Sequence, residues 1–169
     1  MPAIGACRPR DGIASADIRA ARRLCPTLME QITSRPSDVR DVLASLCTTL
    51  QALRLDAADC ATLEIVLAEV LNNIVEHAYL DEHDGWILLE LDYLDGWIAC
   101  KLTDGGCPMP EGQLPTHRAL GDGVDVALLS LPEGGFGWSM IYELTCDLRY
   151  QRIGALNALY FALPLTAQG

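Results

Sequence analysis

Apolar residues recur at steps of three and four residues along two long segments in the first half of the chain. The first segment opens with Pro36, a residue favoured in the first turn of a helix, and extends to Leu53. The second runs from about Leu63 to Tyr79. Its apolar positions are Leu63, Val66, Leu67, Val70, Leu71, Ile74 and Val75. This period predicts two helices with one buried face each, and the short connection between them predicts antiparallel packing.

Five further segments are short, largely apolar and bounded by turn residues, which is typical of β-strands. They are Leu28–Arg35, Trp86–Tyr93, Trp97–Thr103, Asp147–Ile153 and Ala155–Pro164. Asp95-Gly96 is a strong hairpin signal between two of them, and a third helix is predicted from Gly134–Gly137 to about Leu144. This order predicts an α/β (α+β) fold, a two-layer sandwich whose mixed, largely antiparallel sheet carries helices on one face.

Three polar residues interrupt the second helix at a regular spacing. Glu69, Asn73 and His77 stand at positions i, i+4 and i+8, so they lie nearly in line, roughly 6 Å apart per step. A carboxylate, an amide and an imidazole on one stripe suit a site that holds a metal and moves a proton. The alternatives are a solvated charge at Glu69, a surface amide at Asn73, and packing or capping at His77.

Length and composition narrow the class of protein. A chain of 169 residues favours one domain, and no apolar run approaches the roughly 18 residues of a membrane span. The start shows no secretory signal. The seven cysteines include no Cys-x-x-Cys pair, which argues against a zinc site. We therefore expect reduced, buried thiols and a cytoplasmic protein without a membrane partner.

Charge is distributed unevenly along the chain. Residues 1–27 carry five arginines and two aspartates, whereas the remainder is strongly acidic and brings the net charge to −11. An acidic body disfavours nucleic acid and favours a basic protein partner, although plain solubility explains it equally well. We interpret residues 1–27 as an N-terminal extension, either a flexible arm or an added edge helix, with a targeting peptide as the alternative.

Three short motifs follow one another along the chain. They are Glu69-x-x-x-Asn73-x-x-x-His77-Ala78, Asp104-x-Gly106 and Gly135-Phe136-Gly137. Together they resemble the ATP-binding domain of the GHKL superfamily, with its Bergerat-type fold. Within it, Asn73 to Tyr79 and Leu131 to Gly137 resemble the branch of bacterial anti-sigma factors of the RsbW type. The likeness begins near Leu28, so we expect residues 28–169 to form the ATPase domain.

The resemblance implies roles that also make physical sense. It makes Asn73 the Mg²⁺ ligand beside the phosphates of ATP, and Glu69 the general base that accepts a proton from the attacking hydroxyl. Asp104 would accept a hydrogen bond from the adenine amine, and Gly106 would let the backbone pass close to the base. The remaining implied contacts to ATP come from His77, Ala78, Gly135, Phe136 and Gly137. The stretch from Glu111 to Gly134 would close over ATP as a lid.

The family likeness also implies a biological role. It predicts an anti-sigma factor that binds a sigma factor and phosphorylates a serine or threonine of a small STAS-type anti-sigma-factor antagonist, and it implies a homodimer. The alternative is a nucleotide-binding partner-switch module with little or no transfer, because no phosphate-neutralising arginine stands beside Glu133-Gly134 and only Arg118 lies in the lid. The ATPase half of a histidine kinase is disfavoured, since the chain lacks room for a phospho-acceptor domain.

Overall fold

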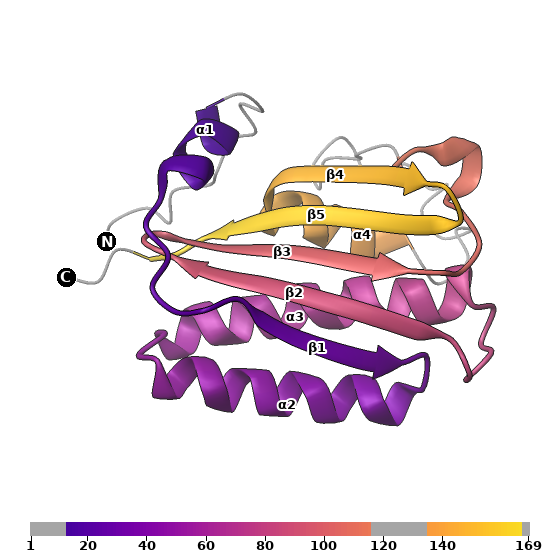
Figure 1. Ribbon diagram of the computed structural model, residues 1–169, viewed down its shortest axis with the longest axis horizontal. Coiled ribbons are helices and arrows are strands. Elements are labelled where there is room, and N and C mark those ends of the chain that lie inside the picture. Colours follow the sequence, from indigo (N-terminus) through magenta and orange to yellow (C-terminus); the bar gives the residue numbers. More distant parts are fainter. Residues whose placement is uncertain (1–12, 116–134, 167–169) are drawn as a thin grey trace, which may run out of the picture.

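The computed structural model describes residues 13–115 and 135–166 as a five-stranded sheet with helices on both sides (Figure 1). The strands are β1 (Leu28–Thr33), β2 (Trp86–Leu94), β3 (Trp97–Asp104), β4 (Cys146–Ile153) and β5 (Leu156–Pro164). Their order in the sheet is β1-β2-β3-β5-β4, and every pairing is antiparallel. The predicted α+β sandwich is confirmed, but the sheet is wholly antiparallel rather than mixed.

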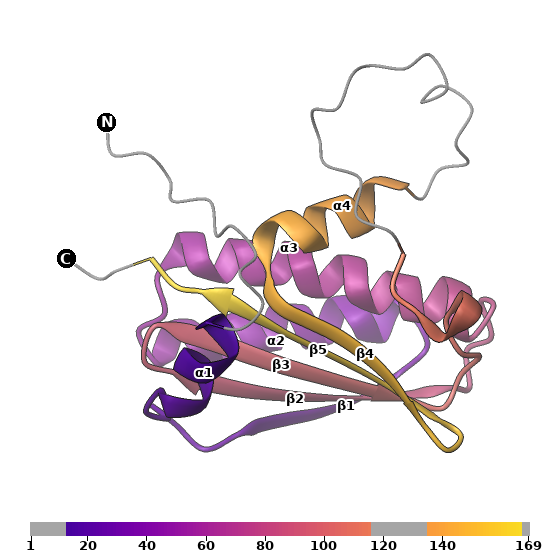
Figure 2. The same cartoon turned by 90° about the horizontal axis from the view of Figure 1, so that it is seen from above.

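Three helices cover one face of the sheet, as predicted (Figure 2). They are α2 (Pro36–Ala52), α3 (Ala57–Asn73) and α4 (Gly135–Leu144). The strands alternate accordingly: the side chains of Ile87, Leu89 and Leu91 on β2 are buried, while their neighbours on the other face are partly exposed. The core forms between this face and the buried stripes of α2 and α3.

Helix α3 starts earlier than the hydrophobic period indicates. Asp56 is its N-cap, and the carboxylate accepts a hydrogen bond from the backbone N–H of Ala58 at 2.8 Å. Leu63, Leu67 and Leu71 are then fully buried against the sheet and α2. This burial fixes the rotation of α3, and with it the direction of the polar residues on its flank.

The end of this helix differs from the prediction. The α-helix stops at Asn73, and Ile74–Ala78 form one π-helical turn, η1, with the N–H of Tyr79 bonded to the carbonyl of Ile74 at 3.0 Å. A π turn closes over five residues and so advances less rotation per residue than an α turn. His77 lies within this turn and is exposed.

The N-terminal segment lies against the sheet. Helix α1 (Ile13–Ala20) lies on the side of the sheet opposite α2 and α3 and contacts the edge strand β4, so it is not a free arm (Figure 2). After it, the N–H of Leu24 donates to the carbonyl of Tyr93 at 2.8 Å, and Arg23 forms an ion pair with Asp92 at 3.0 Å. The division at residue 27 stays a prediction.

The structure tests two predictions made from the composition. No helix among the described residues is both long and apolar enough to cross a membrane. Within the described residues five cysteines are free thiols, as predicted: Cys25, Cys47, Cys60, Cys100 and Cys107. Cys107 is exposed, so the prediction of burial is wrong there. Cys146, by contrast, is disulfide-bonded, so the prediction of reduced thiols is wrong at that position.

Candidate functional site

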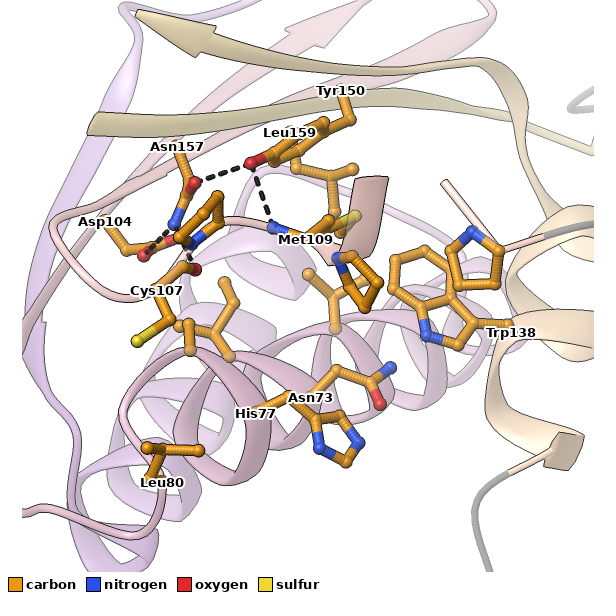
Figure 3. A pocket seen from close by; sticks show the side chains of 16 residues that line it. Asn73, His77, Leu80, Asp104, Cys107, Met109, Trp138, Tyr150, Asn157 and Leu159 are labelled. Atoms are coloured by element: carbon orange, nitrogen blue, oxygen red, sulfur yellow. Dashed lines mark hydrogen bonds between the residues drawn. The ribbon is translucent and has the colours of Figure 1, made fainter. Parts of the chain in front are cut away.

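A cavity of about 460 Å³ lies between the end of α3 with η1, the segment that follows β3, and α4 (Figure 3). Four of the residues singled out from the sequence line it: Asn73, His77, Ala78 and Asp104. Most of the remaining wall is apolar, with Val70, Ile74, Met109, Trp138 and Leu159 among the lining residues. A flat heteroaromatic ring with a few polar edges is the kind of group that such a cavity accommodates.

Asp104 supplies a hydrogen-bond acceptor at one wall of the cavity. It ends β3 and is only 4% exposed. Its Oδ1 accepts from the side chain of Asn157 at 2.7 Å and from the N–H of Gly106 at 2.9 Å. Within the described residues Oδ2 receives no hydrogen bond, so it is available to accept one from a ligand. Burial raises the pKa of Asp104, although these two hydrogen bonds and the charge of Arg152 act in the opposite direction.

Asn73 presents an amide whose nitrogen has no partner in the described part of the protein. Its Nδ2 is buried and forms no hydrogen bond with any described residue, which is costly for a buried polar group. Because no hydrogen bond fixes the amide, either end can turn towards a ligand. Figure 3 shows the amide beside His77 at the cavity. A ligand oxygen or a cation here would remove this cost.

The donor set fits Mg²⁺ bound together with phosphates. The described residues contain no cluster of three or more His, Cys, Asp or Glu side chains that could hold a metal alone. Mg²⁺ often takes only one or two protein oxygens and completes its shell with water and substrate phosphates. The side-chain oxygen of Asn73 meets that requirement, whereas a structural zinc site would need more ligands.

Glu69 lies one turn before Asn73 and contacts the start of α4. A Cβ atom at Gly137 would stand 2.4 Å from Glu69 Oε2 and 4.0 Å from Asn73 Nδ2, so only glycine fits without moving the carboxylate. Glu69 is half-buried, does not line the 460 Å³ cavity, and makes no hydrogen bond to a described residue. A carboxylate held in this way can accept a proton from a group that enters between α3 and α4.

The glycine motifs serve close packing. A Cβ atom at Gly106 would lie 2.6 Å from the carbonyl oxygen of Ala78, and the N–H of Cys107 donates to that same oxygen at 2.8 Å. Gly106 is thus required by the end of η1, whereas the sequence suggested an approach to a bound base. Gly135 begins α4, as predicted. The side chain of Phe136 and most of the expected lid, residues 116–134, lie outside the described part.

Comparison with known proteins identifies the family. A model of the histidine kinase-like ATPase domain matches residues 32–163. The chain belongs to this family. It therefore carries an ATP-binding domain of the type that the three motifs indicated, and the match spans the whole of α2, α3 and the site.

One of the matching solved structures is the crystal structure of the RsbU and RsbW domains of Rv1364c from Mycobacterium tuberculosis. The two chains share 19% sequence identity with a TM-score of 0.58, a likeness that concerns the fold alone. The match covers 85% of this chain and 34% of that chain, so the present chain spans about a third of its structural neighbour. No curated protein sequence matches.

The ATPase domain also places residues at its cavity that the sequence did not single out. Asn157 and Tyr150, on the last two strands, join Asp104 there, and Trp138 comes from α4 (Figure 3). Asn157 offered one signal, because it is a polar residue inside the otherwise apolar run of β5. Its pairing with Asp104 depends on strand register, which a single sequence does not reveal.

Proposed function

We propose that this chain is an ATP-dependent serine/threonine protein kinase that acts as an anti-sigma factor in a partner-switching module. The observation that carries the proposal is the placement of Asn73 and Glu69 one turn apart on α3, beside the start of α4. Among the described residues Asn73 Nδ2 has no hydrogen-bond partner, and the carboxylate of Glu69, one turn earlier and beside Gly137, makes no hydrogen bond. Asp104 offers a separate acceptor within the same ATPase domain.

The proposed mechanism assigns each end of ATP to a different wall. Asp104 Oδ2 accepts a hydrogen bond from the exocyclic amine of adenine, while the apolar side chains enclose the ring. The side-chain oxygen of Asn73 would hold Mg²⁺, which would supply positive charge to offset that of the phosphates. The N–H groups at the start of α4 face the phosphates, since a helix N-terminus favours anions.

The transfer step uses Glu69 as general base. The hydroxyl of a serine or threonine on the antagonist gives its proton to the carboxylate of Glu69 as its oxygen attacks the γ-phosphorus. The bond between the γ-phosphorus and the β,γ-bridging oxygen breaks, and ADP leaves with that oxygen. The products are a phosphorylated antagonist, ADP, and a proton held by Glu69 that passes to solvent.

The distribution of positive charge favours a second candidate function. No arginine or lysine is among the described residues that line the cavity, and Arg152 is engaged by Gly106 and Asn157. Arg118 lies outside the described residues. Phosphoryl transfer gains much of its rate from such a charge, so a nucleotide-binding partner switch with little or no transfer is the alternative.

The partners follow from the same proposal. The sigma factor would be held away from RNA polymerase in the cytoplasm by a homodimer of this chain, and the STAS-type antagonist would release it. The name of the structural neighbour, which contains RsbU and RsbW domains, supports this assignment. The net charge of −11 suits a basic surface on the sigma factor.

Radiolabelled ATP tests the proposal directly. The chain is incubated with Mg²⁺ and a purified STAS-type antagonist from the native host, together with the variants Glu69→Ala and Glu64→Ala. Glu64 is an exposed glutamate of the same helix and is the matched control. Label on the antagonist that disappears only in Glu69→Ala supports the kinase, and nucleotide binding without label supports the partner switch.

Calorimetry then separates binding from transfer. Asn73→Ala should abolish the Mg²⁺-dependent part of ATP affinity and leave the fold intact, because the substitution removes an amide that has no partner in the described protein. Unchanged affinity in the presence of Mg²⁺ would refute the assignment of Asn73.

A further inference from the structure

A row of polar residues crosses the sheet at the cavity. In the strand register Asp104 of β3 stands opposite Asn157 of β5, and Asn157 stands opposite Arg152 of β4. Asn157 is only 4% exposed, so the hydrogen bonds of its amide belong to the protein interior. A buried amide in an otherwise apolar strand costs free energy unless all its groups are bonded.

The nitrogen end of Asn157 donates hydrogen bonds to acceptors at the end of β3 and just after it. Nδ2 donates to Asp104 Oδ1 at 2.7 Å, to the carbonyl of Cys107 at 3.0 Å and to the carbonyl of Gly106 at 3.3 Å. One amide thus ties the carboxylate of Asp104 and the backbone of the next segment to β5 (Figure 3).

The oxygen end of Asn157 is held by two donors from β4. Oδ1 accepts from the hydroxyl of Tyr150 at 2.6 Å and from Nη1 of Arg152 at 2.7 Å. Arg152 also donates to the carbonyl of Gly106 at 3.0 Å, and the N–H of Met109 donates to the Tyr150 hydroxyl at 3.1 Å. Since a guanidinium only donates, the amide oxygen must face Arg152, and the nitrogen must face Asp104.

We propose that Asn157, oriented by Arg152 and Tyr150, is a positioning residue that makes the cavity selective for a purine with an exocyclic amine. With Oδ1 of Asp104 occupied by Asn157 and by the N–H of Gly106, the plane of the carboxylate is fixed and Oδ2 is the acceptor left for the ligand. This inference rests on the proposed binding of ATP and specifies which protein groups prepare the base subsite before the nucleotide enters.

The test compares ATP with purine riboside triphosphate, which lacks the exocyclic amine. The ratio of the two dissociation constants is measured by calorimetry for the wild type and for Asn157→Leu, Asn157→Ser and Tyr150→Phe. We expect the wild type to prefer ATP, and Asn157→Leu to reduce this preference by about tenfold, the usual effect of misplacing one hydrogen bond to a charged group. Asn157→Ser keeps a donor and should retain part of the preference.

Two further variants sharpen the comparison. Tyr160→Phe removes a hydroxyl from the same strand as Asn157 but on the opposite face of the sheet, where Tyr160 contacts Arg149, so it should keep the wild-type ratio. In Asp104→Asn the preference should be lost, and adding Asn157→Leu should reduce it no further, because both act through one carboxylate. Should Asn157→Leu fail to fold, Tyr150→Phe carries the test, with a smaller loss of preference.

The outcomes separate this inference from the proposed function. If the wild type prefers ATP and both Asn157→Leu and Tyr150→Phe keep that preference, or lose affinity for the two nucleotides equally, the positioning role is overturned while ATP binding stands. If the wild type binds neither nucleotide, the proposed function is refuted and the inference with it.

Discussion

The carboxylate of Asp104 is buried, and in its ionised form it costs stability. Burial raises its pKa despite the hydrogen bonds from Asn157 and Gly106. The folded protein therefore binds this proton more tightly than the unfolded chain does. The stability that Asp104 contributes is present below the ordinary pKa of 3.8 and is lost as the pH rises through the raised folded value.

Asp104→Asn should therefore be at least as stable as the wild type at neutral pH. The new amide can still accept from Asn157, and it has no charge to desolvate. Thermal unfolding followed over a pH series should show a Tm advantage for the variant at neutral pH that shrinks in acid, where the wild-type carboxyl is also neutral. A wild type that is more stable at neutral pH would contradict this account. ATP affinity should fall, since the amide now directs N–H groups to the adenine amine.

Gly137→Ala should separate activity from stability. The added methyl group would stand 2.4 Å from Glu69 Oε2, the far end of a flexible side chain that can move away. Alanine is better than glycine within a helix by about 1 kcal/mol, so the Tm should hold or rise. Phosphate transfer should fall by about 100-fold, the usual contribution of a general base, because the carboxylate is displaced.

The control for this prediction is a double variant. In a Glu69→Ala background there is no carboxylate for the new methyl group to displace. Gly137→Ala should therefore cause no further loss of phosphate transfer in the labelled-ATP assay. A further loss of similar size would show that Gly137 acts through the phosphates and not through Glu69.

Local patterns predict a candidate site residue when its partners are near in sequence. Asn73 and Glu69 stand one helical turn apart, so the helix period alone places them together. Asn157 lies 53 residues from Asp104, and their contact depends on the pairing of β3 with β5. Tyr150 joins through a second pairing, so neither residue could be assigned to the site without the fold.

At the scale of elements, burial explains which predictions succeeded. Helix α2 and the five strands begin and end within about two residues of the hydrophobic pattern, because each buries a face with a regular period. The π turn escaped prediction because Ile74 and Val75 are both buried there, and that pair fits the α and the π geometry alike.

Because η1 contacts the segment after β3, two adjacent glycines differ in how well they tolerate an added Cβ atom. A Cβ atom at Gly106 would lie 2.6 Å from the backbone oxygen of Ala78, whereas one at Gly105 would lie 3.4 Å from the side chain of Trp86. Gly106→Ala should therefore lower stability by about 1–3 kcal/mol, because backbone has to shift, while Gly105→Ala should change it by less than about 1 kcal/mol.

Denaturant unfolding of the two alanine variants checks this difference. ATP affinity should also fall in Gly106→Ala, since the carbonyl of Gly106 is bonded to Arg152 and Asn157. Equal losses of stability in the two variants would mean that the segment adapts freely around η1.

On the scale of the whole molecule, the two faces of the sheet differ. The helix-covered face holds the core and the cavity lined by Asn73 and Asp104. The other face carries a row of paired residues: Glu90, Lys101, Tyr160 and Arg149. Lys101 pairs with Glu90, and Arg149 lies 5.2 Å from the centre of the Tyr160 ring. These opposite charges offset one another locally, so the net charge of −11 must be carried elsewhere on the chain.

That net charge leads to a prediction about the proposed sigma factor. An acidic protein attracts a basic partner over distances set by ionic screening, which shortens from about 10 Å at 0.1 M salt to about 3 Å at 1 M. The association rate, measured by stopped flow, should fall at least about tenfold between these conditions, with the dissociation rate changing less. Circular dichroism at both salt concentrations controls for folding. A rate that is independent of salt would show that the acidic charge serves solubility, the alternative that composition alone leaves open.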